Sequence, residues 1–196
     1  VEVCIDEAAH VAGKDPIEYR RDLLGENPRL RAVLDLAAEK SGWGTPLGER
    51  RGRGVAVISD FGSYAAMVAQ VAVDEHGAIK VERIVCAVDC GVVINPGVLH
   101  QQVESGIVYG LSAALYGRIT VQNGGVVEGN FDDQPVVRMN DCPQIEVHVI
   151  PSTESPGGIG ELSTPGVAPA LLNAIFAATG TRLRELPIDT SQLRRA

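Results

Sequence analysis

The stretch Pro156-Gly157-Gly158-Ile159-Gly160-Glu161 stands directly before the strongest helix pattern of the chain, which covers residues 164–180. Three glycines within four positions permit backbone angles that a Cβ forbids, and they let another body approach the chain closely. We therefore predict that this loop seats a ligand. A tight turn with a solvated acid explains the same residues about as well, because glycine is first of all a turn residue.

The helix pattern after the loop has its own start and stop signals. Thr164 suits the N-cap, Pro165 suits the first helical position, and Gly180 ends the pattern. Glu161 is the only acid of the glycine loop and comes a few residues before this helix begins. Partial positive charge at a helix N-terminus favours an ionised carboxylate. Glu161 is therefore a candidate general base.

Composition excludes some partners. The 196 residues include 17 basic and 25 acidic side chains, which gives a net charge of −8. This charge argues against a nucleic-acid backbone or an anionic membrane as the main partner. No apolar run reaches the length of a membrane span. Since the chain starts at Val1 within a helix pattern, we expect a fragment of a longer protein, whose compartment, cytoplasm or periplasm, stays open.

The order of patterns predicts an α+β fold. Three short helices occupy residues 1–43, a mixed portion with an antiparallel hairpin sheet and two long buried helices covers residues 52–188, and residues 189–196 are expected to be a frayed tail. Alternation and turn signals predict the remaining elements. These are strands at 55–58, 67–73, 79–88 and 145–150, hairpin turns at 74–77 and 123–124, and a deeply buried helix from Asn95-Pro96 to Gly117. Residues 128–142 are assigned to no element.

The cysteines and histidines do not form a metal-binding pattern. Cys4, Cys86, Cys90 and Cys142 include no C-x-x-C pair, and no two histidines stand at the spacing of zinc ligands. We expect the cysteines to be small buried hydrophobes and expect no metal held by protein side chains. Trp43 is expected to pack the end of the third helix against the body of the protein.

A second group of polar residues lies at the junction between the third strand and the next helix. It consists of Asp89-Cys90-Gly91, Asn95-Pro96 and Gln101-Gln102. Side-chain amides near a helix start can present donors and acceptors to a heterocycle or a pterin-like ring. Helix capping and turn formation explain the same residues equally well, so both interpretations stay open.

Several motifs together resemble the C-terminal part of molybdenum hydroxylase large subunits, the xanthine dehydrogenase and aldehyde oxidase family. Within that family the motifs are most similar to those of the isoquinoline 1-oxidoreductase β-subunit branch, and the resemblance spans nearly the whole chain. The motifs, in chain order, are Ala87-Val88-Asp89-Cys90-Gly91, Asn95-Pro96, the run of residues 102–117, Gly157-Gly158-Ile159-Gly160-Glu161, Pro169 and Asn173-Ala174-Ile175-Phe176.

The resemblance implies a cofactor and roles for particular residues. It implies molybdopterin with molybdenum, in the cytosine dinucleotide form of bacterial relatives, and the metal is held by the pterin. Glu161 would be the general base in the hydroxylation of an aldehyde or N-heterocycle with water as the oxygen source. Gln102 would lie near the pterin, and the backbone of Gly158, Ile159 and Gly160 beside the molybdenum ligands. Iron–sulfur clusters would lie on a small subunit or another domain.

The chain departs from the sequence motifs of the family at two places. It reads Gly160-Glu161-Leu162-Ser163-Thr164-Pro165 where members usually have Gly-Glu-Pro-Gly-Thr-Pro, and Glu104-Ser105-Gly106 where near relatives have acid-Gly-Gly. As a partner the chain would need the rest of the large subunit, so alone it is expected to be inactive. Two alternatives are a non-catalytic cofactor-binding or assembly module, and a carboxylate-dependent hydrolase with a second acid near Glu161.

Overall fold

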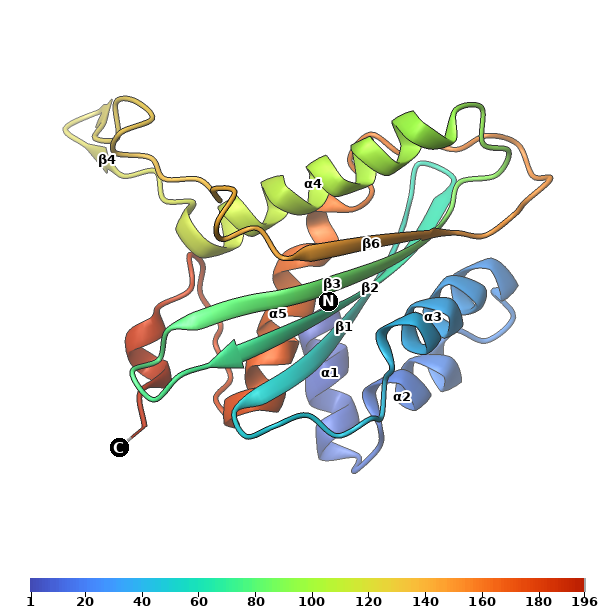
Figure 1. The fold of residues 1–196 in the computed structure, drawn as a ribbon, viewed down its shortest axis with the longest axis horizontal. Coiled ribbons are helices and arrows are strands. Elements are labelled where there is room, and N and C mark those ends of the chain that lie inside the picture. The colour runs from blue at the N-terminus through green and yellow to red at the C-terminus, as the bar shows by residue number, and fades with distance from the viewer. Residues whose placement is uncertain (196) are drawn as a thin grey trace.

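A mixed sheet forms the centre of the computed structural model, which describes residues 1–195 (Figure 1). Its strands lie in the order β1-β2-β3-β6. Strands β1 (Arg51–Asp60), β2 (Ser63–Val73) and β3 (Ile79–Asp89) are antiparallel neighbours. Strand β6 (Gln144–Val149) pairs with β3 in parallel. The predicted α+β class is confirmed, and the hairpin sheet gains a parallel strand because the chain crosses over through α4 before it returns.

Helix α5 (Thr164–Thr179) covers one face of the sheet (Figure 1). The main apolar core lies here, and Met67 of β2, Ile84 of β3 and Leu171 of α5 are fully buried in it. Strand β1 approaches α5 closely, since a Cβ on Gly54 would overlap the backbone nitrogen of Ala174. A glycine at this position therefore lets helix and sheet backbones meet.

Three helices precede the sheet, and α3 packs on its other face. They are α1 (Glu2–Val11), α2 (Pro16–Leu23) and α3 (Pro28–Ser41). Val33 and Leu34 of α3 form a second apolar cluster with Val55 of β1 and Val68 of β2. Because helices cover both faces of β2, this strand is buried almost without interruption.

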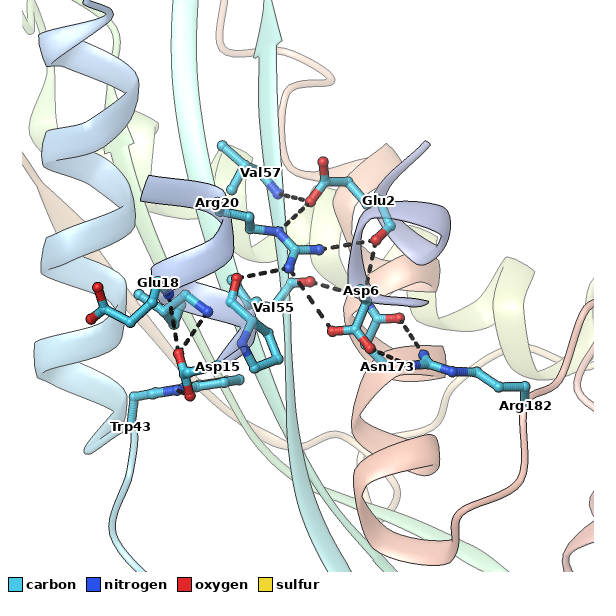
Figure 2. A network of polar contacts seen from close by, with 12 residues as sticks. Glu2, Asp6, Asp15, Glu18, Arg20, Trp43, Val55, Val57, Asn173 and Arg182 are labelled. Atoms are coloured by element: carbon cyan, nitrogen blue, oxygen red, sulfur yellow. Dashed lines mark hydrogen bonds and ion pairs between the residues drawn. The ribbon is translucent and has the colours of Figure 1, made fainter. Parts of the chain in front are cut away.

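A polar network fastens the N-terminal helices to the body of the protein (Figure 2). Arg20, which is 2% exposed, donates to the Glu2 carboxylate at 2.9 Å. The same Glu2 oxygen accepts the backbone N–H of Val57 on β1, and Arg182 donates to Asp6 at 2.6 Å. The charges of this network are paired, as burial demands, so α1 is held between β1 and the segment after α5.

Trp43 has the packing role that the sequence predicts. Its ring is half-buried against the apolar cluster under α3, and its Nε1 donates to Asp15 at 2.9 Å. The other Asp15 oxygen accepts the backbone N–H groups of Ile17 and Glu18, so Asp15 also caps α2 (Figure 2). One aspartate thus joins the start of α2 to the end of α3.

Two predictions about α4 and the C-terminal segment are wrong. Helix α4 (Pro96–Tyr116) buries only one face, and Val98 and Tyr109 are 55% and 73% exposed. Residues 189–195 are not a frayed tail, because they contain the 3₁₀ helix η1 (Thr190–Leu193), whose Leu193 is 2% exposed. Arg50 donates to the Leu193 carbonyl at 2.7 Å and thereby ties this segment to the start of the sheet.

The remaining hairpin agrees with its turn signal, and two of the four cysteines are buried as predicted. The 123–124 turn joins β4 (Val121–Gln122) to β5 (Gly125–Val126), an exposed ribbon beyond the end of α4 (Figure 1). Cys86 and Cys90 are buried as predicted, and burial raises the pKa of the Cys86 thiol to about 12. Cys4 and Cys142 are exposed, so the prediction of buried cysteines is wrong for these two.

Candidate functional site

The glycine loop, residues 156–161, lies beside the β1–β2 turn and the end of β3. The backbone N–H of Gly157 donates to the Cys90 carbonyl at 2.8 Å, and that of Gly158 donates to the Phe61 carbonyl at 2.8 Å. Cys90 directly follows β3, and Phe61 lies in the turn between β1 and β2. Two backbone hydrogen bonds therefore fix the first half of the loop on the sheet.

The three glycines of the loop serve different purposes. A Cβ on Gly158 would lie 2.7 Å from the Phe61 Cβ, and one on Gly157 would lie 2.7 Å from the Gly62 carbonyl oxygen. A Cβ on Gly160 would meet no atom within 4 Å. None of the three has a positive φ, so the predicted need for unusual angles is wrong. At the first two positions the β1–β2 turn of the same chain makes the close approach, and the approach of a ligand stays a prediction.

Gln102 connects α4 to the second half of the loop. Its Nε2 donates to the Gly160 carbonyl oxygen at 2.9 Å across 58 residues of sequence. Ile159 packs against the main core, which leaves its backbone as the part available to a ligand. The structure therefore brings together three of the predicted cofactor-binding residues, Gln102, Ile159 and Gly160. The fourth, Gly158, is in the same loop and contacts Phe61.

The other polar residues of the strand–helix junction have structural roles. Asn95 accepts the backbone N–H of Val98 at 3.1 Å and caps α4. Asp89 accepts two hydrogen bonds from the Arg29 guanidinium, at 2.8 and 2.7 Å, and one from the Gly91 backbone at 3.0 Å. The Arg29 hydrogen bonds hold the pKa of the Asp89 carboxyl below its usual value. Capping and turn formation thus account for these two residues.

Glu161 is exposed and lines a groove of about 340 Å³. The other lining residues are Asp60, Phe61, Leu162, Thr164 and Pro165. Within residues 1–195, the Glu161 carboxylate forms no ion pair, so it remains available to a ligand. The N-cap position of α5 is occupied by Ser163, without a side-chain capping bond, so the assignment of Thr164 as N-cap is wrong. Ser163 instead donates to the Val103 carbonyl of α4 at 3.0 Å.

Helices α4 and α5 meet through two glycines just behind the groove. A Cβ on Gly110 would lie 2.7 Å from the Thr164 carbonyl oxygen, and a Cβ on Gly106 would overlap the Ser163 hydroxyl. Ser105, one of the departures from the family wording, is on the exposed face of α4. The serine therefore leaves the α4–α5 contact intact, because the neighbouring Gly106 makes it.

Asp60 and Phe61 are the lining residues that sequence reasoning missed. Asp60 ends β1, and Phe61 begins the two-residue turn Phe61-Gly62, which carries a weak turn signal. A larger cavity, of about 660 Å³, lies among residues 182–192 with Arg118, and none of the predicted site residues lines it. We place the site at the smaller groove because Glu161 lines it and directly follows Gly160, to which Gln102 is hydrogen-bonded.

Two further observations concern metal ions and membranes. Residues 1–195 contain no group of three or more His, Cys, Asp or Glu side chains placed to hold a metal ion. None of their helices combines the length and the apolar character that crossing a bilayer requires.

The candidate site thus combines an open glycine loop, an amide that is hydrogen-bonded to it and an unpaired carboxylate directly after it. The chain belongs to the molybdopterin cofactor-binding domain family, whose model matches residues 31–143. The matched region includes Gln102.

Curated relatives extend the similarity over nearly the whole chain. The β-subunit of isoquinoline 1-oxidoreductase from Brevundimonas diminuta is 34% identical over 191 residues, which is 95% of this chain and 24% of the relative. A nicotinate dehydrogenase chain from Pseudomonas putida is 34% identical over 211 residues, 98% of this chain and 18% of the relative. This chain therefore spans about a quarter or less of these two relatives.

Solved structures show the same fold. Quinoline 2-oxidoreductase from Pseudomonas putida 86 superposes with a TM-score of 0.61 at 21% identity, over 66% of this chain and 18% of that one. The aldehyde oxidoreductase from Desulfovibrio desulfuricans superposes with a TM-score of 0.57 at 23% identity, over 68% of this chain and 16% of that one.

Proposed function

We propose that this chain is part of the cofactor-binding portion of a molybdenum-dependent hydroxylase that acts on an aldehyde or an N-heterocycle. The observation that carries the proposal is that Glu161 lines the groove and directly follows Gly160, whose carbonyl oxygen accepts a hydrogen bond from Gln102. Relatives named as oxidoreductases of isoquinoline and nicotinate support the substrate class. The rest of the large subunit and a small iron–sulfur subunit are the proposed partners.

Two features of the loop support the binding of a pterin cofactor. A Cβ on Gly160 would point into open space, and Gln102 holds the Gly160 carbonyl by a hydrogen bond. Gly158, Ile159 and Gly160 would hold the cofactor through their backbone, and Gln102 through its amide. When bound, the cofactor supplies the two-electron oxidation and the transfer of oxygen from water. We propose the cytosine dinucleotide form, with the iron–sulfur clusters outside this chain.

Glu161 performs the proton transfer in this proposal. Its carboxylate is exposed in the groove, directly after Gly160 and two residues before the N-cap of α5. An unpaired carboxylate can accept a proton at one oxygen when a hydroxyl group becomes acidic beside it. Leu162, 1% exposed, packs in the core immediately after it and limits the freedom of the backbone that carries the base.

The test is Glu161→Gln in the full-length enzyme. The amide keeps the shape of the side chain but cannot accept the proton, so turnover should fall by at least about 100-fold. Molybdenum content should stay at the wild-type level, because Glu161 does not hold the loop. The matched control is Glu154→Gln, an exposed acid of the same connection. Wild-type turnover by Glu161→Gln enzyme that contains molybdenum would contradict the proposal.

Two other functions make different predictions for the same preparations. A non-catalytic cofactor-binding or assembly module would contain molybdenum and show no turnover with any aldehyde or N-heterocycle. A carboxylate-dependent hydrolase has one observation in its favour, because Asp60 lines the groove together with Glu161. One Asp60 oxygen already accepts the Phe61 N–H at 2.9 Å. Hydrolysis of an ester probe by metal-free protein, abolished by Asp60→Asn, would support the hydrolase.

A further inference from the structure

Phe61 has a backbone conformation that phenylalanine rarely adopts. Its φ is +54°, in the left-handed region, and the next residue, Gly62, has φ +74°. For residues other than glycine, asparagine and aspartate this region is crowded by the Cβ. The Phe61 side chain is also 56% exposed, which is unusual for a large aromatic ring. Neither the turn nor the core therefore explains a phenylalanine at this position.

Contacts on both sides of the residue maintain this conformation. The Phe61 N–H donates to the Asp60 carboxylate at 2.9 Å, and the Phe61 carbonyl accepts the Gly158 N–H at 2.8 Å. The Phe61 Cβ also lies against the Cα of Gly158, where a second Cβ would be 2.7 Å away. Strained residues that their surroundings hold in place are concentrated at functional sites. Together these contacts fix the backbone of Phe61 in the conformation in which Phe61 lines the groove.

The composition of the groove indicates what would bind there. Phe61 and Pro165 contribute exposed apolar surface, while the carboxylates of Asp60 and Glu161 provide its polar part. An exposed aromatic face gains most from a second ring, which can stack on it or meet it edge to face. A flexible aliphatic chain covers the same face without that geometric preference.

We propose that Phe61 is a specificity-determining residue that binds the planar ring of an aromatic or heteroaromatic substrate beside Glu161. The inference rests on the proposed function and makes it narrower, since it favours aromatic over aliphatic substrates. Phe61 acts on binding, whereas Glu161 acts on the proton transfer. The two roles can therefore be separated in one set of variants.

The test compares Phe61→Leu with wild type in the full-length enzyme. Leucine remains apolar and makes the same demand on the backbone, but it has no ring. With quinoline as substrate, kcat/KM should fall roughly fivefold to tenfold, mainly through KM. With butanal, kcat/KM should stay within about twofold of wild type, because no stacking is lost. The control is Phe131→Leu, which removes a ring that is 79% exposed outside the groove.

A binding measurement makes the test independent of turnover. Saturation-transfer NMR on the full-length protein should show quinoline bound to wild type, to Glu161→Gln and to Phe131→Leu, with most of the signal lost in Phe61→Leu. An unchanged quinoline signal in Phe61→Leu, or no signal in wild type, would overturn the inference. Failure of the proposed function has another signature, retained turnover by Glu161→Gln, so the two failures are distinguishable.

Discussion

The Nε2 atom of Gln102 donates a hydrogen bond of 2.9 Å to the carbonyl oxygen of Gly160. This bond joins the long helix α4 to the residue directly before the proposed base. Both residues are exposed, so their position depends on this contact more than on burial. Gln102 thus has a positioning role in the loop whether or not it also contacts the cofactor.

Replacing Gln102 by leucine should therefore loosen the loop without affecting the core. A single hydrogen bond of this kind contributes about 1 kcal/mol, so kcat of the full-length enzyme should fall roughly fivefold. The thermal unfolding midpoint should not change measurably. Gln101→Leu is the matched control, because Gln101 is an adjacent exposed amide that makes no side-chain hydrogen bond within residues 1–195. Equal losses of kcat in the two variants would argue against the positioning role.

Gly158→Ala and Gly160→Ala should affect different properties of the protein. The Gly158 Cβ would push on Phe61, so Gly158→Ala should destabilise the β1–β2 turn by about 1–3 kcal/mol. The Gly160 Cβ would meet no atom of the chain, so Gly160→Ala should leave the unfolding midpoint unchanged. If Gly160 faces the cofactor, the same variant should contain less molybdenum than wild type. Elemental analysis and thermal unfolding on matched preparations separate the two effects.

Full molybdenum content together with normal turnover in Gly160→Ala would show that the open face of Gly160 does not approach the cofactor. The assignment of Gly160 as a cofactor-binding residue would then be wrong. The proposed role of Glu161 as the base would not be affected by this outcome, because that role depends on its carboxylate in the groove.

Local patterns predicted most of the fold. Asn95-Pro96, for example, correctly marked where α4 begins. Two misses had one cause, which is that burial depends on partners distant in sequence. Leu193 looked like part of a polar tail until Arg50, far away in the chain, was seen to hold its carbonyl. The helix over residues 95–117 was expected to be deeply buried, but one face of α4, with Val98 and Tyr109, is exposed in this chain.

The site was predictable in part for the same reason. Glu161, Gly160 and Gln102 were found because short motifs contain them, and the motifs resemble those of a known family. Phe61 was missed, since neither its positive φ nor its contact with Gly158 leaves a mark in the local sequence. Pairings between a turn and a loop nearly a hundred residues apart require coordinates.

Gly110→Ala tests the packing that supports the groove. A methyl group there would lie 2.7 Å from both the Thr164 carbonyl oxygen and the Val167 side chain, so α4 must move away from the first turn of α5. We expect a loss of about 2 kcal/mol, measured as a lower thermal unfolding midpoint. Gly97→Ala is the control in the same helix, because its Cβ would find ordinary contact distances. Gly97→Ala should be neutral or slightly stabilising, since alanine favours helix.

Asp89 connects the stability of the site to pH. Its side chain is 4% exposed and is paired with Arg29, so Asp89→Asn should destabilise the protein by about 2 kcal/mol at pH 7. The Arg29 hydrogen bonds hold the folded-state pKa of Asp89 below its unfolded value of about 4. The stabilisation by the carboxylate is therefore complete above the unfolded pKa and is lost as the pH falls through the folded one.

The difference in unfolding midpoint between wild type and Asp89→Asn should accordingly be constant from pH 7 to about pH 5 and shrink below about pH 4. Asp22→Asn is a suitable control, because Asp22 and its partner Lys14 are both more than half exposed and their pairing should matter little. A difference that grows on acidification would mean that the Arg29–Asp89 pair is not what holds the end of β3. Because Gly157 donates to Cys90 directly after Asp89, faster hydrogen exchange at the Gly157 amide in Asp89→Asn should accompany the loss.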